Sequence, residues 1–282
     1  METAESADGV CLPLPPEEMR RLVGPVDTSF FDNPSGDLAL PGLPPAAFDS
    51  ILDFGCGCGR VARKLLQQRV RPSRYLGIDL HRGMIDWCRA NLAPHRNGFE
   101  FEHHDVFNLS LNPGADKPLW LPFPAADGDF SLVNAWSVFT HVNQDQASFY
   151  LGEVARVLRV DGLLLSTWFL FEKKFFPMMQ PFQNALFINE IDSTNAVIFA
   201  REWLILLARS KGLKLVGAVP PTLRGYQWIL TFAPETSVLT PVNMPEDSAP
   251  FGEMPPPLMP ERAFEIGRLA KVEQADPGCL AR

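Results

Sequence analysis

Long apolar runs are missing from this 282-residue chain, in which no stretch approaches the 18 uninterrupted apolar residues of a membrane-spanning helix. The first twenty residues begin METAESADGV and lack the apolar core of a secretory signal. These two absences predict a cytoplasmic protein with no membrane partner.

Clustered positive charge is also missing. The chain has 25 basic and 33 acidic residues, a net charge of −8, and no run rich in lysine or arginine. Binding to nucleic acid rests on cationic contacts to phosphates. We therefore expect no nucleic-acid partner.

Cysteines are few, and their spacing fits neither a disulfide framework nor a zinc site. The five thiols are an odd number and include no pair of CxxC units. We expect reduced thiols and no metal. Cys56 and Cys58 flank Gly57 before an expected helix, where a lowered thiol pKa would allow metal or thiol chemistry; packing of small side chains between glycines is the favoured interpretation.

The middle of the chain alternates between strand and helix patterns, and both flanks are richer in proline. The pattern predicts an N-terminal arm or lid (1–49), a central domain (50–233) with a cap insertion (170–198), and a proline-rich tail (234–282) with a weak helix at 261–274. In the arm, a short helix is expected between Pro16 and Gly24. Expected strands of the domain are 51–54, 74–80, 99–103, 130–135, 163–168, 213–219 and 226–232, and expected helices are 60–68, 83–92, 146–158 and 199–211.

The last two expected strands are joined by PPTLRG, which is too short for a helical crossover, whereas the earlier connections allow parallel crossovers. These features predict an α/β fold: a doubly wound, Rossmann-like, seven-stranded sheet that is mostly parallel with one antiparallel strand, plus the N-terminal helical arm and the lid insertion.

The segment ILDFGCGCGR carries the strongest chemical signal. An apolar strand ends in Asp53, and Gly55, Gly57 and Gly59 follow directly before a helix. Glycines at this turn let the backbone approach a ligand closely, at the position where doubly wound sheets bind nucleotides. The GxGxG spacing is neither the GxGxxG of a dinucleotide fold nor a P-loop, which disfavours a phosphate ligand.

Two further acids end the next strands. Asp79 closes YLGIDL, 20 residues after Gly59, where a carboxylate can accept hydrogen bonds from both ribose hydroxyls. Asp105 in HHDVF can receive an adenine amino group, beside Val106. Parallel strands end at one edge of a sheet, so the three acids are expected to point into one crevice.

In order and spacing, residues 50–233 resemble a class I S-adenosylmethionine-dependent methyltransferase of the small-molecule type. ILDFGCGCG resembles the methionine-side motif, GIDLHRGM the ribose motif, HHDVF the adenine motif, and FSLVNAWSVFTHV and LRVDGLLLSTW the two strands that follow. The resemblance implies S-adenosyl-L-methionine as cofactor. It implies cofactor-binding roles for Asp53, Gly55, Cys56, Gly57, Gly59, Asp79, Leu80, Met84, Asp105, Val106 and Asn134.

His141 follows the fourth expected strand, where the family positions its methyl acceptor. A histidine there can act as the catalytic base, and a capping or packing role is the equal alternative. Of His103 and His104, which alternate along a strand, one is expected to face the pocket. The cap and the arm are expected to form an apolar acceptor pocket whose substrate-binding residues are Phe30, Phe31, Trp136, Phe171, Phe175 and Met178.

These features predict an enzyme that transfers a methyl group to a small, partly apolar molecule, with oxygen as the first candidate. Two alternatives stay open: a non-catalytic S-adenosylmethionine-binding regulatory protein, and a nicotinamide-dependent oxidoreductase on the same architecture. The cap can instead form a dimer interface, so a homodimer also stays open.

Overall fold

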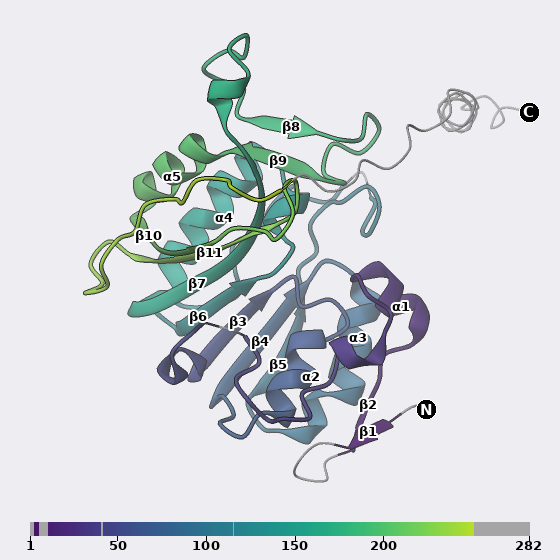
Figure 1. The fold of residues 1–282 in the computed structure, drawn as a ribbon. Coiled ribbons are helices and arrows are strands. Elements are labelled where there is room, and N and C mark those ends of the chain that lie inside the picture. The colour runs from purple at the N-terminus through teal and green to yellow at the C-terminus, as the bar shows by residue number, and fades with distance from the viewer. Residues whose placement is uncertain (1–2, 6–10, 41, 115, 251–282) are drawn as a thin grey trace, which may run out of the picture.

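The computed structural model describes residues 3–5, 11–40, 42–114 and 116–250. Its main sheet runs in the order β10-β11-β7-β6-β3-β4-β5, and β8 and β9 extend it beyond the end of β7 (Figure 1). The strands of this sheet are β3 (Ser50–Phe54), β4 (Arg74–Asp79), β5 (Phe99–His103), β6 (Phe130–Ala135), β7 (Leu158–Phe171), β8 (Ala185–Phe187), β9 (Val197–Ala200), β10 (Leu213–Val219) and β11 (Trp228–Pro234).

Helices cover both faces of the sheet. Successive side chains of a strand point to opposite faces, so Ile51 packs toward α2 and α3 whereas Leu52 packs toward α4 and α5. All five residues of β3 are buried, as expected for a central parallel strand. The helices are α1 (Glu17–Leu22), α2 (Arg60–Gln67), α3 (Arg82–Asn91), α4 (Gln144–Val157) and α5 (Arg201–Ser210), with 3₁₀ turns η1 (Thr28–Phe30), η2 (Pro45–Phe48), η3 (Ala93–His95), η4 (Phe139–His141) and η5 (Lys173–Phe175).

The expected reversed strand is confirmed. β11 pairs antiparallel with both β10 and β7, while β7, β6, β3, β4 and β5 pair in parallel. The sheet is therefore the mostly parallel, doubly wound sheet that the sequence predicts.

Several boundaries differ from the expectation. β7 begins at Leu158, directly after α4, because Leu158 already pairs with Phe130 of β6, and a bulge follows before the pairing resumes at Leu163. α4 begins at Gln144, since Asn143 and Gln146 form a capping box. Phe199 was expected in a helix but lies in β9, paired with Leu170 of β7, and α5 begins only at Arg201.

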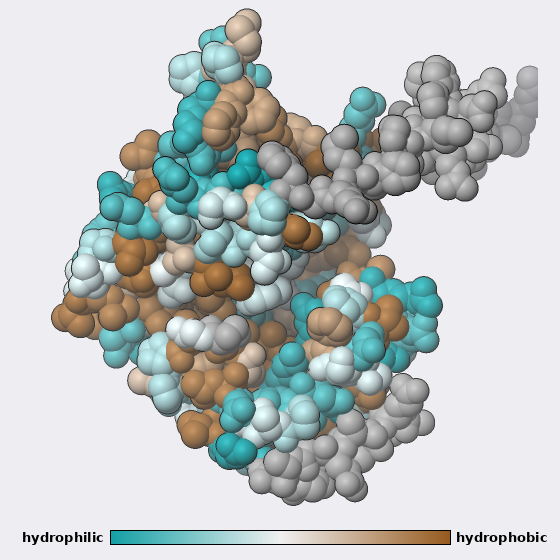
Figure 2. Space-filling view, viewed as in Figure 1, coloured by the Kyte–Doolittle hydropathy of each residue, from teal (hydrophilic) through white to brown (hydrophobic). Residues whose placement is uncertain are grey.

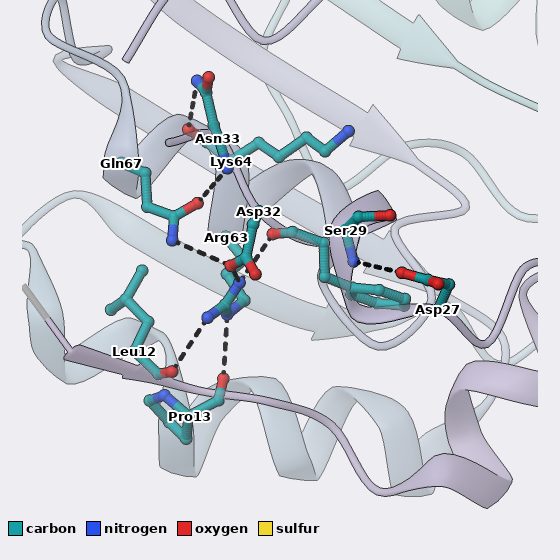
Figure 3. A network of polar contacts seen from close by, with 10 residues as sticks. Leu12, Pro13, Asp27, Ser29, Asp32, Asn33, Arg63, Lys64 and Gln67 are labelled. Atoms are coloured by element: carbon teal, nitrogen blue, oxygen red, sulfur yellow. Dashed lines mark hydrogen bonds and ion pairs between the residues drawn. The ribbon is translucent and has the colours of Figure 1, made fainter. Parts of the chain in front are cut away.

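The N-terminal arm is held on α2 by a buried arginine (Figure 3). The Arg63 guanidinium is fully buried and donates hydrogen bonds to the carbonyl oxygens of Leu12 (3.1 Å), Pro13 (3.2 Å) and Phe31 (2.8 Å), and it pairs with Asp32. The arm begins with a two-stranded hairpin, β1 (Thr3–Glu5) and β2 (Cys11–Pro13), and continues through α1. These contacts place the end of α1 beside the carboxyl edge of the sheet.

The cap segment leaves the end of β7 and projects from the molecule before it returns through β8 and β9 (Figure 1). After β11 the chain forms no further helix or strand up to residue 250. The helix expected at 261–274 lies outside the described residues.

Candidate functional site

A cavity of about 450 Å³ lies at the carboxyl ends of β3, β4 and β6. Its floor is the glycine loop after β3, and its other walls come from the arm, from the loop after β5 and from residues 192–195. This is the edge of the sheet at which doubly wound folds bind ligands.

The glycine loop has no room for side chains at its alternate positions. Gly55, Gly57 and Gly59 all have positive φ angles of 78°, 53° and 80°. A Cβ at Gly55 would lie 2.4 Å from Val138 Cγ2, and one at Gly57 would lie 2.6 Å from Val23 Cγ1. The alternation of glycines is thus required by the turn itself as well as by any ligand above it.

Asp79 shapes this loop from the end of β4. Its carboxylate accepts hydrogen bonds from the backbone N–H of Gly57 and of His81, each at 2.8 Å. Burial raises the pKa of Asp79, and the two backbone bonds oppose that shift. The carboxylate lines the cavity, where the ribose role predicted for it remains a prediction.

Asp53 and Asn134 form a buried pair at the centre of the floor. Asp53 accepts hydrogen bonds from the Tyr75 hydroxyl and from the Asn134 amide nitrogen, each at 2.6 Å, and burial raises its pKa to about 6. The Asn134 amide oxygen is buried and has no hydrogen-bond partner in the part of the chain that the structure describes. A buried acceptor without a donor is costly, so this wall of the cavity calls for a ligand that donates.

Arg60, the first residue of α2, lines the same cavity. Its guanidinium makes no hydrogen bond or ion pair with the described residues, and burial lowers its pKa while the nearby Asp53 raises it. The cavity therefore holds an unpaired cation as well as an unpaired acceptor.

Eight of the eleven residues predicted to bind the cofactor line this cavity: Asp53, Gly55, Cys56, Gly57, Asp79, Leu80, Val106 and Asn134. Gly59 and Met84 lie behind the loop, where Gly59 faces Leu92 and Met84 packs beside Gly57. Asp105 is not among the lining residues. A hydrogen bond from Asn112 and an ion pair with Lys117 lower the pKa of Asp105 to about 2.

The residues predicted to bind the acceptor are not brought together. Trp136 lines the cavity, but Phe31 is buried against Cys58 and Met84, and Phe30 is exposed. The other three, Phe171, Phe175 and Met178, lie at the end of β7 and in the projecting cap. In their place the structure puts Val23 and Gly24 of the arm and Asp192, Thr194 and Asn195 of the cap at the cavity.

Of the two histidines at the end of β5, His104 faces the cavity and His103 does not. Its Nε2 lies 3.0 Å from the Tyr150 hydroxyl, and burial lowers its pKa to about 4, so the ring is neutral. Tyr150 comes from α4, 46 residues away, and no sequence spacing indicates that pairing. His103 instead bonds the Leu80 carbonyl at 2.9 Å.

His141 lies in η4, at the exposed rim of the cavity. Its Nδ1 is 3.2 Å from the Thr194 carbonyl oxygen. A carbonyl only accepts, so Nδ1 carries the hydrogen, and in the neutral ring Nε2 is left with a lone pair. The ring is therefore arranged to accept a proton.

The cysteines at the glycine loop are not arranged for thiol chemistry. Cys56, Cys58 and Cys88 are free and buried, and burial raises the pKa of Cys58 to about 12.

Within the described ranges no three His, Cys, Asp or Glu side chains are grouped to hold a metal ion. None of the helices in those ranges has the length and apolar character to cross a bilayer.

Comparison with known proteins places residues 51–162 in a family described as a methyltransferase domain. Two curated relatives match about 120 residues: a fatty-acid O-methyltransferase of Mycolicibacterium smegmatis (34% identity) and phthiotriol/phenolphthiotriol dimycocerosates methyltransferase 1 of Mycobacterium ulcerans (33%). Each match covers 42% of this chain and 36% of the relative, so the chain matches about a third of their length.

Among solved structures, a TehB-like S-adenosylmethionine-dependent methyltransferase of Corynebacterium glutamicum is similar at 21% identity and a TM-score of 0.43. The match covers 68% of this chain and 82% of that one.

Proposed function

We propose that the chain transfers the methyl group of S-adenosyl-L-methionine to an oxygen atom of a small, partly apolar acceptor. Residues 51–162 match a family described as a methyltransferase domain, and the order of the chain's motifs resembles that of class I S-adenosylmethionine-dependent methyltransferases. The two unpaired groups of the cavity carry this proposal. The methionine part of the cofactor has one ammonium and one carboxylate. The Asn134 amide oxygen requires a donor and the Arg60 guanidinium requires an anion.

The remaining floor fits the nucleoside part of the cofactor. The Asp79 carboxylate can accept from ribose hydroxyls, and Leu80 and Val106 supply apolar contacts for a base. When bound, S-adenosyl-L-methionine supplies a sulfonium methyl group that a nucleophile displaces in line. The chain's own task is to hold the acceptor against that methyl and to exclude water, for which the arm and residues 192–195 provide the cover.

The acceptor assignment is supported by the relatives and by the cover of the cavity. The curated relatives are named a fatty-acid O-methyltransferase and a phthiotriol/phenolphthiotriol dimycocerosates methyltransferase. Leu111, Trp136 and Val138 also line the cavity and give it an apolar part. This mixture suits an acceptor with an oxygen at one end and an apolar body.

Calorimetry with S-adenosylhomocysteine and NADH tests the cofactor. We expect S-adenosylhomocysteine to bind and Arg60→Met to weaken it by about 10- to 100-fold, because a charge-assisted bond contributes about 1.5 to 3 kcal/mol. Arg69→Met is the matched control, since Arg69 is exposed and pairs with Asp37. Binding of NADH in place of S-adenosylhomocysteine would refute the proposal.

A transfer assay then tests the reaction. Radiolabelled S-adenosylmethionine is offered with long-chain fatty acids, phenols and aliphatic alcohols, and product is extracted into solvent. Label in an O-methyl ester or ether supports the assignment. Tight cofactor binding without transfer to any of the three classes favours the regulatory alternative.

A further inference from the structure

The projecting segment, defined as residues 173–191, exposes an unusual amount of apolar side chain. Seven of its apolar residues are between 43% and 87% exposed, whereas most apolar residues of that size in the described chain are buried: Phe175, Phe176, Met178, Phe182, Phe187, Ile188 and Ile191. Figure 1 shows this segment standing away from the layers, and Figure 2 shows hydrophobic atoms on it. Exposed apolar clusters of this kind mark interaction sites.

Charge on the segment is opposite to that of the whole protein. Residues 173–191 contain two lysines and one acidic residue, Glu190, and so have a net charge of +1 in a chain whose net charge is −8. The Lys174 ammonium lies 5.0 Å from the centre of the Phe175 ring and pairs with Glu172, which Arg201 also neutralises. The segment therefore has a small net positive charge, and both of its lysines lie in η5.

The segment is held in shape by its own contacts. The Lys173 ammonium donates to the carbonyl oxygens of Gln180 (2.7 Å) and Pro181 (3.2 Å), which closes the loop after η5. β8 then pairs antiparallel with β9, and β9 pairs with β7 of the main sheet. A preformed protrusion loses little conformational entropy when it binds.

The root of the segment is part of the cavity wall. Asp192, Thr194 and Asn195 follow it directly and line the cavity. Asp192 accepts from Ser110 Oγ at 2.7 Å, and the Thr194 carbonyl faces His141. Whatever binds the protrusion is therefore brought close to the mouth of the site.

We propose that residues 173–191 dock the protein on an anionic membrane surface, with the exposed aromatic and aliphatic side chains in the acyl boundary and Lys174 beside the headgroup phosphates. Delivery of a lipid acceptor from that surface to the cavity rests on the proposed function; the docking itself does not. A narrow apolar protrusion with lysines suits a fluid lipid interface, where affinity grows with buried apolar area and with cationic charge.

Vesicle flotation of the full chain tests this proposal. We expect at least tenfold stronger binding to phosphatidylcholine vesicles that contain one quarter phosphatidylglycerol than to pure phosphatidylcholine, and weaker binding as salt rises. The triple variant Phe175→Ser/Met178→Ser/Phe182→Ser should lose at least tenfold in partitioning. Lys174→Gln should lose about fivefold, which corresponds to about 1 kcal/mol for one lysine near the surface.

The matched control is Leu206→Ser/Val219→Ser, which removes exposed apolar side chains from α5 and β10. It should bind vesicles like the parent. Unchanged binding of the triple variant, or equal losses in the control, would overturn the proposal. Light scattering that shows a parent dimer, lost in the triple variant and accompanied by no vesicle binding, would assign the segment to contact between copies and would also overturn it.

Failure of the proposed function has a separate signature. Vesicle binding is measured without cofactor, and S-adenosylhomocysteine affinity is measured without vesicles. Vesicle binding with no cofactor affinity would leave the docking intact and refute methyl transfer. An unchanged melting temperature and cofactor affinity in the triple variant establish that the variant is folded.

Discussion

Asp53 is a buried carboxyl whose two hydrogen bonds do not offset the loss of water. Its pKa is raised to about 6, above an unfolded value near 4, so its protonated form is favoured by folding. The resulting stabilisation is present below pH 4 and is lost as pH rises through 6. We expect Asp53→Asn to remove this loss, on the order of 3 kcal/mol between pH 4 and 7, as measured by urea unfolding of variant and parent.

Asp49→Asn provides the opposite control. A hydrogen bond from Arg159 lowers the pKa of the exposed Asp49, so its contribution to stability is lost only as pH falls below 4 and is constant between pH 4 and 7, where Asp49→Asn should leave the pH slope of stability unchanged. Parallel pH profiles for the parent and Asp53→Asn would show that Asp53 does not titrate in this range.

Asp79 joins the loop to the helix behind it as well as facing the cavity. Asp79→Ala would leave the N–H groups of Gly57 and His81 without acceptors, at about 1 to 3 kcal/mol each. We expect a lower melting temperature and at least tenfold weaker S-adenosylhomocysteine binding in calorimetry well below that temperature. Asp86→Ala, an exposed acid on α3, should change neither. Parent-like affinity in Asp79→Ala would end the ribose assignment.

His141 offers a test of which acceptors need a base. His141→Gln should lower kcat by about 10²- to 10⁴-fold for an alcohol, which must lose a proton, and should leave a carboxylate acceptor unaffected because it is already ionised. Cofactor affinity should stay unchanged, since the imidazole sits at the rim. If the variant melts early or loses cofactor affinity, His141 is a packing residue.

At the scale of elements, Arg63 of α2 makes four of the polar contacts that hold the arm, and the side chains of Gln67 and Gln68 accept further hydrogen bonds from its backbone. Arg63→Met would leave Asp32 and three carbonyl oxygens without their donor, and breaking a buried pair costs about 3 to 5 kcal/mol. We expect faster proteolysis within residues 11–37 and a lower urea midpoint. Arg69→Met, which breaks an exposed pair, should stay within about 0.5 kcal/mol of the parent. Equal proteolysis of both variants would show that the Arg63 contacts do not hold the arm in place.

Elements that are encoded by neighbouring residues could be predicted from the sequence. The strand at 51–54, its glycine loop and the reversed pair at the end of the sheet were predictable because apolar runs, turn residues and connection lengths encode them. The prediction that placed Phe199 in a helix was wrong, because an apolar residue beside a helical pattern fits a helix face as well as a buried strand. Only its pairing with Leu170 decides between the two, and that contact is distant in sequence.

For the whole molecule, the floor of the cavity could be predicted from the ends of successive strands. The arm and cap residues that cover the cavity could not be predicted in this way. Val23 and Asp192 reach the cavity because the arm and the cap fold back over it, through contacts such as those of Arg63 and Ser110. Such contacts join residues with no common motif. The aromatic residues of the cap fitted an acceptor pocket in composition, yet the structure turns several of them to solvent.

Ligand binding should stabilise the molecule as one unit. At a concentration 100 times its dissociation constant, S-adenosylhomocysteine should add about 2.7 kcal/mol, which corresponds to a rise in melting temperature of about 5 to 10 °C for a chain of this size. Differential scanning calorimetry measures this, with NADH at equal concentration as the control. A rise with NADH alone would contradict the cofactor assignment.

The Arg63 contacts also impose an order of assembly during synthesis. Leu12 and Pro13 leave the ribosome about 50 residues before the guanidinium that binds them. Until α2 forms, their carbonyl groups lack the Arg63 donor, and closing a loop of that length costs chain entropy before any contact repays it. The arm should thus be the late-folding part of the N-terminal half, added to a β3-α2-β4 unit that is already in place.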